Sequence, residues 1–489
     1  MESPERVRVR ITDPAEDRWE VPPALFPPVP PSERSTREPA SRVYKLNYSK
    51  EPFGLAVTRR ATGELLFNAT PAAGRGSGLT FEEQLVTLTA LVPETFWLYG
   101  VGEQNAPHRL PRGGLNADGS ELVDVYTLLA KDQQVPRHDP AGGTGLYGSH
   151  PLLIAVSSES GTAFGIFLRS SAAMDVLLSR DSVAFRAVGG VVDFSVLMGP
   201  SIREIITQYT DIVGRPALPP YWGLGFHLCR WGYGGVDKAS AVVEAMRVAG
   251  VGQDAQWLDI DYMQQAHDFS VDPLAYPLGM MRAFVAKLHA QGQRFVPIVD
   301  PGIAAFPAGA YPPLDEGLAA GVFVLDAGTG APVKGRVWPG DTLFPDFLHP
   351  AAGDWWTAQL RRFQALLSFD GLWLDMNEPS NFCDGPCDKP TRPETSCGDF
   401  AEADKTCRGG TTEAEVARKG RLFAPWKLRM MGGRKREPAM LPYIPGGRPL
   451  EEKTLAMDSV HCVADRGRAQ RTAACCTKAA QFDVNNLYG

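Results

Sequence analysis

The sequence predicts an α/β protein that begins with an N-terminal β-sandwich-like domain and continues in repeated strand–helix units. Up to about residue 210, apolar and polar residues alternate with a period of two, interrupted by Gly, Asn and Asp, as in antiparallel strands. After Pro219, short apolar runs alternate with segments whose apolar residues recur at helical spacing. We therefore expect one domain over residues 1–212, a second over 213–382, and an irregular cysteine-containing and basic loop region over 383–489.

Short motifs mark individual strands of the first domain. Val7, Val9 and Ile11 alternate with polar residues, and the segments FGLAVT and ELLFNA flank a turn over residues 59–63, which predicts a hairpin. Two more apolar strands are expected in TAFGIFLRSS and VVDFSVLMGP. The Pro-rich segment ALFPPVPPSERSTREP predicts an exposed loop.

The second part alternates strands with helices. The strands are expected in LGFHLC, DAQWLDID, RFVPIVDPGI and GLWLD, and Asp237 is the expected N-cap of a helix that ends near Gly250. Apolar residues at helical spacing indicate two further helices, one with Met281, Phe284, Val285 and Leu288, the other with Trp356, Leu360, Phe363 and Leu367. Such units indicate parallel strands covered by helices, in a doubly wound sheet or a (β/α) barrel.

Length and composition exclude several functional classes. The chain has 489 residues, of which 44% are hydrophobic. This length is more than one hydrophobic core usually organises, so we expect two or more domains. A net charge of -7 argues against a phosphate-binding surface, so we expect no nucleic-acid partner and a neutral or weakly polar substrate. No window approaches the roughly 18 uninterrupted apolar residues of a membrane span, so we expect no membrane partner.

Features of the sequence point to two different cellular locations. Residues 1–23 contain no apolar segment of the kind that a signal peptide needs. Two glycosylation sequons, at Asn47 and Asn68, and the cysteine usage are typical of the oxidising secretory pathway. Our interpretation is that the chain starts inside a domain, downstream of a targeting segment. A cytoplasmic protein is the alternative.

Acidic and aromatic side chains follow the predicted parallel strands at their carboxyl ends. They are Arg230 and Trp231, Asp259 and Asp261, Asp300, and Asp375 and Glu378. A single aspartate after a strand is more often a helix N-cap than a catalyst. Four successive strands ending in this way favour the catalytic rim of a barrel, where the loops after the strands build the site.

Asp375 is the strongest candidate catalytic residue. It closes the apolar run GLWL, and Glu378 follows three residues later in a Pro-containing loop. A carboxylate at the end of a buried strand is unfavourable unless it is paired, hydrogen-bonded or titrated. A second acid so close makes a purely structural cap or turn the weaker interpretation.

The motifs along the chain resemble those of glycoside hydrolase family 31. GLWLDMNEPSNF resembles the family's nucleophile signature, and PPYWGLGFHLCRWGY resembles its first barrel strand in the acid α-glucosidase and maltase type. Similar segments are DAQWLDIDYM, VPIVDPGI, GRVWPGDTLFPDF, FWLYGVGEQ, GTGLYGSHP, VGGVVDFSVLMGP and the final NNLYG. The resemblance implies a (β/α)8 TIM barrel, and because we count about four strand signals, we expect an incomplete one that exposes strand edges.

The resemblance also implies a reaction and its residues. It implies a retaining α-glucosidase that releases terminal non-reducing glucose from maltose, starch or glycogen-type oligosaccharides, with Asp375 as nucleophile and Glu378 as a supporting carboxylate. Asp259 corresponds to the residue that grips the sugar hydroxyls, and Asp132 to an aspartate on a loop of the N-terminal domain that reaches over the site. The apolar wall positions are Trp231, Ile303, Trp338, Trp373 and Met376. For any one tryptophan, core packing is the alternative.

The same resemblance sets expectations for cofactors, location and completeness. No metal or organic cofactor is expected, the partner is an α-glucan or maltose-type substrate, and the location is extracellular, vacuolar or lysosomal. The acid/base, which follows in a later strand-end motif of the family, has no counterpart here, so we expect the chain alone to be inactive. The alternatives are an α-xylosidase, an α-galactosidase, or a non-catalytic glucan-binding fragment.

Several cysteines, one histidine and a basic stretch are expected to have structural roles. Cys383, Cys387, Cys397 and Cys407 favour disulfides over zinc, which prefers tighter paired spacing. The basic stretch 417–438 resembles no family segment and is expected to be a solvated loop. His227 is expected to be a hydrogen-bonded residue at a strand end, and Cys229 a buried thiol.

Overall fold

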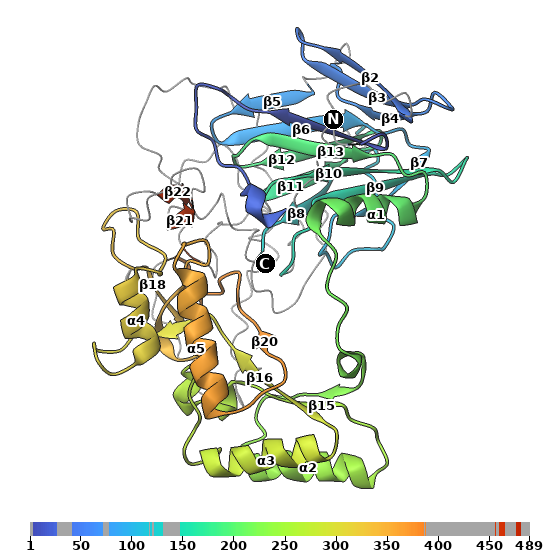
Figure 1. Cartoon of the computed structure of the whole chain (residues 1–489). Helices are drawn as coiled ribbons and strands as arrows, with labels where there is room; N and C mark the ends of the chain where they lie inside the picture. Colours follow the sequence, from blue (N-terminus) through green and yellow to red (C-terminus); the bar gives the residue numbers. More distant parts are fainter. Residues whose placement is uncertain are drawn as a thin grey trace.

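The computed structural model describes residues 3–26, 42–71, 78–116, 118–119, 122–130, 147–385, 387, 455, 459–464 and 476–480. Asp132, Cys397, Cys407, the basic stretch 417–438 and the NNLYG segment lie outside these ranges. The described chain forms a β-rich body and an α/β body (Figure 1). In the described part of the chain, no helix has the length and apolar character needed to cross a membrane.

The first body contains two antiparallel sheets that pack face to face. One has the order β1-β13-β10-β9-β7 and the other β2-β3-β4-β6-β12-β11-β8, with β5 paired to β6. The strands are β1 Arg6–Ile11, β2 Tyr44–Ser49, β3 Gly54–Arg59, β4 Leu65–Asn68, β5 Leu79–Glu82, β6 Leu85–Leu91, β7 Phe96–Gly100, β8 Asp124–Leu128, β9 Leu152–Ser157, β10 Ala163–Leu168, β11 Met174–Leu178, β12 Ser182–Ala187 and β13 Val192–Leu197.

Alternating apolar residues of both sheets fill a single core between them. Phe67 of β4 and Phe194 of β13 stack with their ring centroids 5.0 Å apart, which joins the two sheets. The predicted hairpin is the pair β3 and β4, and Gly63 takes the positive φ of 74° that its turn requires. Helix α1, Ile202–Val213, begins with a capping box formed by Ser201 and Glu204. The helix covers the outer face of the sheet that contains β9, β10 and β13 (Figure 1). The predicted β-sandwich-like first part is confirmed.

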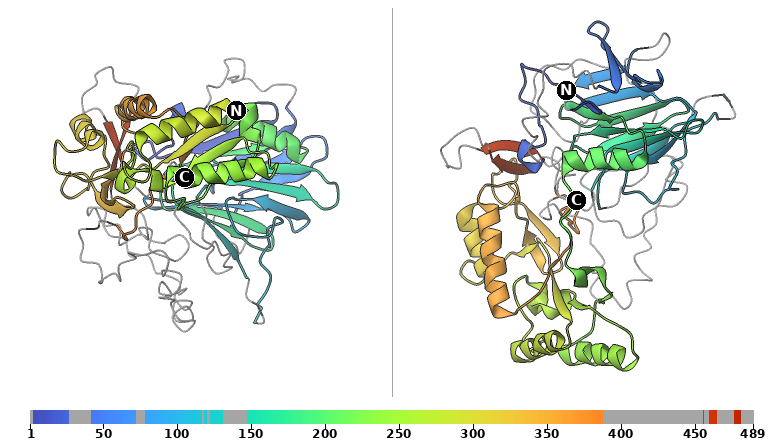
Figure 2. Two further views of the ribbon diagram at one scale, coloured as in Figure 1. Left: turned by 90° about the horizontal axis from the view of Figure 1, so that it is seen from below. Right: turned by 45° about the vertical axis from the view of Figure 1, so that its right-hand side comes forward.

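The second body is built on a parallel sheet of the order β14-β15-β16-β20. Its strands are β14 His227–Leu228, β15 Ala255–Leu258, β16 Arg294–Val299 and β20 Trp373–Leu374, and its helices are α2 Val236–Val248, α3 Leu278–Ala290 and α5 Ala352–Leu366. Helices α2 and α3 lie side by side in both views (Figures 1 and 2). This curled parallel sheet is half of a (β/α) barrel, which confirms the predicted incomplete TIM barrel.

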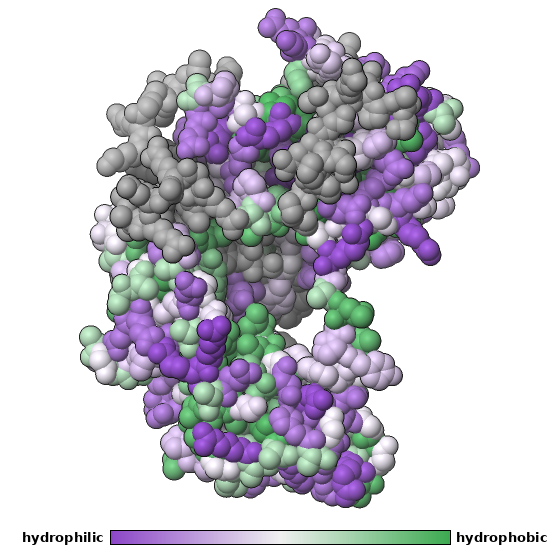
Figure 3. Space-filling model, in the orientation of Figure 1, coloured by the Kyte–Doolittle hydropathy of each residue, from purple (hydrophilic) through white to green (hydrophobic). Residues whose placement is uncertain are grey.

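The open sheet leaves apolar side chains in contact with solvent. Strands β14 and β20 are its two edges among the described residues. Leu224, before β14, is 67% exposed, and Leu374, in β20, is 56% exposed. Apolar patches are visible on this body among polar side chains (Figure 3). The expectation of exposed edges and apolar faces is therefore met.

Two helix details differ from the sequence prediction. Gly235, with φ 146°, is the N-cap of α2, so Asp237 lies in the first turn, where its charge still complements the helix dipole. In α5 the buried residues are Ala352, Trp355, Gln359 and Phe363, and Trp356 is partly buried. The helix packs between two hydrophobic clusters, so its apolar surface is wider than the single predicted stripe.

A small antiparallel sheet interrupts the strand–helix alternation after β16. It has the order β17-β19-β18, with β17 Ile303–Ala304, β18 Lys334–Val337 and β19 Gly340–Leu343, and helix α4, Pro312–Ala320, packs beside α5. The hairpin of β21 Val460–Ala464 and β22 Cys476–Ala480 lies later in the chain. His461 Nδ1 lies 3.3 Å from Asp346 Oδ1, and both side chains are buried. This contact attaches the later segment to the second body.

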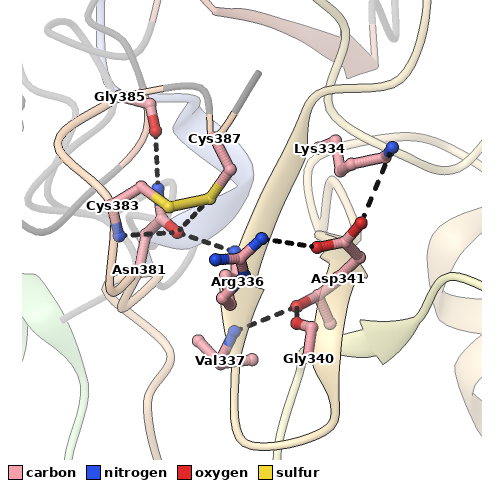
Figure 4. Close-up of a disulfide and its surroundings, with 10 residues drawn as sticks. Lys334, Arg336, Val337, Gly340, Asp341, Asn381, Cys383, Gly385 and Cys387 are labelled. Atoms are coloured by element: carbon pink, nitrogen blue, oxygen red, sulfur yellow. Dashed lines mark hydrogen bonds and ion pairs between the residues drawn. A yellow bond between two sulfur atoms is a disulfide. The ribbon is translucent and has the colours of Figure 1, made fainter. Parts of the chain in front are cut away.

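A disulfide follows the loop that carries Asp375. Cys383 and Cys387 are bonded, with their Cα atoms 5.6 Å apart, so the prediction of disulfides is confirmed for this pair. Asn381 is fully buried beside it: its Oδ1 accepts hydrogen bonds from the N–H groups of Arg336 and Cys383, and its Nδ2 donates to the Gly385 carbonyl (Figure 4). Asn381 therefore fastens this loop to β18.

Candidate active site

Three predicted acidic residues leave the carboxyl ends of neighbouring strands. Asp259 directly follows β15, Asp300 follows β16 and Asp375 follows β20. The register pairs Ile298 with Trp373 and Val299 with Leu374, so Asp300 and Asp375 are the next residues on adjacent parallel strands. The carboxyl ends of a barrel's strands are where catalytic side chains stand. The structure thus gathers these carboxylates at one rim.

The backbone around Asp375 turns sharply away from the strand. Asp375 is half-buried, and its Oδ1 accepts the N–H of Met376 at 2.9 Å. Met376 adopts a φ of 62°, an unfavourable left-handed conformation for a residue with a long side chain. Glu378, two residues further on, is only 4% exposed. The carboxylate of Asp375 therefore stands half-buried at the strand end, while Glu378 is buried.

Asp259 begins a short 3-10 helix over Ile260–Tyr262 and caps it with its own side chain. Its Oδ1 accepts the Ile260 N–H at 2.7 Å. Burial raises its pKa above the ordinary value, and the charges of Asp261 and Asp375 raise it further. Tyr276 donates its hydroxyl to Asp261 Oδ2, so Asp261 is held by a hydrogen bond. Asp259 and Asp375 are thus close enough to influence each other.

Trp338 and Met376 are brought into direct contact. The Trp338 indole N–H lies 2.9 Å from the Met376 sulfur, and the Trp338 ring packs edge-on against Phe382 with centroids 4.9 Å apart. Trp338 follows β18, so the small antiparallel sheet carries one side of the site. Trp338 keeps 38% of its surface exposed. This geometry gives an apolar surface beside Asp375.

The other predicted wall residues occupy different environments. Trp373 is partly buried in β20 and packs on Trp257, with ring centroids 5.6 Å apart. Trp231 is 55% exposed after β14. Ile303 is fully buried in the cluster under the small antiparallel sheet. The predicted Asp132 lies outside the described residues. Of the predicted wall residues, Trp338 and Met376 are therefore the two that the structure brings into direct contact with each other.

Asp268 is a buried carboxyl that the sequence reasoning missed. Its Oδ1 accepts the backbone N–H of Asp300 at 2.8 Å, and the residue is only 1% exposed. It lies in the irregular segment after the 3-10 helix Gln264–Ala266, without any strand pattern before it. Burial raises its pKa well above the ordinary value, and the charge of Asp300 adds to this. Only the tertiary structure brings it to the end of β16.

The environments of His227 and Cys229 are also defined. His227 Nδ1 accepts the Trp257 indole N–H at 3.0 Å, and Nε2 lies 3.0 Å from the Trp222 carbonyl. The prediction of a hydrogen-bonded strand-end residue is confirmed. The prediction of a buried thiol at Cys229 is wrong, because the residue is exposed at the end of edge strand β14. Within the described ranges, no three His, Cys, Asp or Glu side chains are arranged to hold a metal ion.

Two family models match the chain. The TIM-barrel domain of glycosyl hydrolases family 31 matches residues 216–489, and the N-terminal galactose mutarotase-like domain of glycosyl hydrolase 31 matches residues 2–176. The first match alone covers more than half of the chain. The two matches occur along the chain in the same order as the two bodies of the structure.

Curated relatives are similar over most of this chain. Lysosomal alpha-glucosidase of Mus musculus is 41% identical over 387 residues, 79% of this chain and 37% of that protein. Alpha-xylosidase 1 of Arabidopsis thaliana is 37% identical over 414 residues, 81% of this chain and 43% of that protein. The chain thus spans about two fifths of the length of these relatives.

Solved structures share the fold. A glucosidase II alpha subunit matches with a TM-score of 0.62 at 23% identity, over 71% of this chain and 41% of that chain. A GH31 dextranase of Flavobacterium johnsoniae, complexed with isomaltotriose, matches with a TM-score of 0.63 at 22% identity, over 77% of this chain and 44% of that chain. At these identities the likeness concerns the fold alone.

Proposed function

The chain belongs to glycosyl hydrolase family 31, and from this membership we propose that it carries the nucleophile of a retaining α-glucosidase. The observation that carries the proposal is the position of Asp375, a half-buried carboxylate at the carboxyl end of β20 whose backbone turn presents it at the barrel rim. The substrate would be terminal α-linked glucose of maltose, starch or glycogen-type oligosaccharides.

In the proposed reaction, Asp375 attacks the anomeric carbon and the glycosidic oxygen leaves with a proton from a general acid. A β-glucosyl ester of Asp375 forms, and water then hydrolyses it with the acid acting as base, so the α-configuration is retained. Asp375 must therefore be ionised. We assign the general acid to none of the described residues, since Glu378 is buried on the nucleophile's own loop. Residues 1–489 alone should then fail to turn over an aryl α-glucoside.

The other site residues have supporting roles in this proposal. Asp259 would accept hydrogen bonds from vicinal hydroxyls of the non-reducing sugar, because a carboxylate offers only acceptors. Glu378 would hold the nucleophile loop in place. Trp231, Ile303, Trp338, Trp373 and Met376 would form the apolar wall around the glucose, and Asp132 would reach over the site from the N-terminal domain.

An α-xylosidase is the alternative substrate class, supported by the Arabidopsis relative at 37% identity. The mouse lysosomal relative, at 41% identity, favours glucose, and its location supports a place in the secretory pathway. A panel of 5-fluoro α-glycosyl fluorides tests the nucleophile and the preferred sugar. Fluoride leaves without protonation, and the 5-fluoro group slows hydrolysis of the ester. Labelling of Asp375 by the glucosyl reagent is expected; preferential labelling by the xylosyl reagent would establish the alternative.

The same labelling tests the nucleophile without requiring a general acid. Asp375→Asn should abolish labelling, whereas Asp354→Asn, which removes an exposed charge in α5, should leave it unchanged. If the purified wild-type protein is folded and forms no ester with either sugar, the proposal is wrong and the non-catalytic glucan-binding fragment becomes the better description.

A further inference from the structure

We propose that Asp300 is a positioning residue of this site, held as a neutral carboxylic acid beside Asp375 so that Asp375 keeps its negative charge. This inference rests on the proposed function, because it takes Asp375 to be the nucleophile. It assigns Asp300 no contact with the sugar.

The position of Asp300 follows from the strand register. Pairing of Val299 with Leu374 makes Asp300 and Asp375 the next residues on adjacent parallel strands, and such strands lie about 4.8 Å apart. Side chains at corresponding positions of neighbouring strands point to the same side of the sheet. The two carboxyl groups therefore leave the sheet in the same direction.

Asp300 is buried without a charge partner. It is only 4% exposed, and its Oδ1 is shielded from solvent and has no hydrogen-bond partner in the described part of the chain. None of the ion pairs formed among described residues includes Asp300 or Asp268. An ionised carboxylate in such an environment is strongly unfavourable, and protonation removes the cost.

Among the described residues, the charged groups that act on Asp300 are carboxylates. Asp375 and Glu378 approach from the loop after β20, Asp259 from the end of β15, and Asp268 from the segment after Gln264–Ala266. The nearby tyrosines do not offset them, since Tyr262 donates its hydroxyl to the Ile298 carbonyl and Tyr311 donates to the Asp268 carbonyl. Burial raises the pKa of Asp300 well above the ordinary value, and the charges of Asp375, Asp259 and Glu378 raise it further.

Asp300 and Asp268 differ in what stabilises their charged forms. Asp268 Oδ1 accepts the Asp300 N–H at 2.8 Å, and a hydrogen bond to a carboxylate favours ionisation. Asp300 accepts no such bond from the described residues and faces three further carboxylates. If Asp268 and Asp300 share one proton, protonation of Asp300 is therefore the more favourable state. With Asp300 neutral, Asp375 has one fewer negative neighbour and remains ionised for attack.

Infrared difference spectroscopy tests the protonation directly, without any need for catalysis. Wild-type protein at neutral pH should show the carbonyl band of a protonated carboxyl group, and Asp300→Asn should lose it while Asp354→Asn retains it. Asp300→Asn preserves shape and neutrality, so the fold should survive. If the variant does not fold, a pH titration of the wild-type band shows whether the protonated carboxyl group has a raised pKa. Ordinary aspartates lose their protonated-carboxyl band by about pH 6. A wild-type spectrum without the band at neutral pH overturns the proposal, as does its full retention in folded Asp300→Asn.

The rate of Asp375 labelling by 5-fluoro α-glucosyl fluoride tests the consequence. In the wild type the rate should rise through acidic pH as Asp375 loses its proton, and then stay level. Asp300→Asn, which is neutral at every pH, should label within about threefold of wild type at the optimum and keep the same acidic limb, because Asp375 then still has a neutral neighbour. The infrared band, which a merely structural role would not change, is the readout that distinguishes the two roles. A loss of labelling above about tenfold in folded Asp300→Asn at every pH contradicts the neutral role. Absence of wild-type labelling refutes the proposed function, while the infrared result still decides the protonation of Asp300.

Discussion

Asp300 and Asp375 stand at corresponding positions of the adjacent parallel strands β16 and β20, one residue beyond the pair Val299 and Leu374. Two carboxyl groups in this relationship cannot both be ionised cheaply when one of them is buried. The arrangement gives each a distinct state, with Asp375 charged at the rim and Asp300 neutral behind it.

The buried acids predict how stability changes with pH. Asp268 and Asp300 have pKa values raised above the ordinary value of 3.8, so between that value and the raised pKa the folded state binds more protons than the unfolded state. The free energy of unfolding should therefore fall as pH rises, by about 1.4 kcal/mol per pH unit over the range in which the pair holds one proton. Chemical denaturation at several pH values measures this slope. Asp300→Asn should make it shallower than in wild type; an unchanged slope contradicts the raised pKa.

Trp338→Phe should weaken the apolar side of the site. The substitution keeps an aromatic ring but removes the indole N–H that meets the Met376 sulfur at 2.9 Å. We expect the concentration of α-glucosyl fluoride needed for half-maximal labelling to rise by roughly fivefold, an effect of about 1 kcal/mol. Trp97→Phe is the control, since Trp97 lies in β7 of the first body. Equal effects of the two substitutions would mean that Trp338 has no special role.

Asn381→Ala should destabilise the second body. Asn381 is fully buried and bonds to the N–H groups of Arg336 and Cys383 and to the Gly385 carbonyl. Leaving these groups unpaired should cost about 1–3 kcal/mol. Thermal unfolding of Asn381→Ala, compared with Gln364→Ala at an exposed position of α5, measures the loss. A melting temperature equal to that of wild type would show that water replaces these bonds freely.

The sequons predict glycosylation if the protein enters the secretory pathway. Asn47 is exposed in β2, an edge strand of its sheet, so a glycan there meets no packed surface. Peptide mapping of protein from a eukaryotic secretory host should find a glycan at Asn47, and Asn47→Gln should remove it without loss of the fold. Mapping that finds Asn47 unmodified in a secreted sample contradicts this prediction.

Local patterns were sufficient to predict much of the fold. The β3–β4 hairpin, the helix face of Met281, Phe284, Val285 and Leu288, and the strand before Asp375 all follow from periodicity and turn residues. The sheet of β17, β18 and β19 was not predicted, since its strands are only two to four residues long and carry little periodic signal. The wider buried face of α5 arises from two separate clusters, which no single-helix pattern encodes.

The site shows the same division between local and tertiary information. Asp259 and Asp375 stand directly after apolar strands, so sequence alone identifies them as rim residues. Asp268 stands in an irregular segment and reaches Asp300 only through the fold. The contact between Trp338 and Met376 likewise joins residues 38 positions apart. The exposure of Cys229 depends on β14 being an edge strand, which its own residues do not reveal.

We propose that Asp375 is the nucleophile of a retaining α-glucosidase. The most direct measurement is mass spectrometry of the protein after incubation with 5-fluoro α-glucosyl fluoride, followed by peptide mapping. We expect one added 5-fluoroglucosyl group, located on Asp375 and absent from Asp375→Asn. A stable label on another residue, or no label on folded wild-type protein, would contradict it.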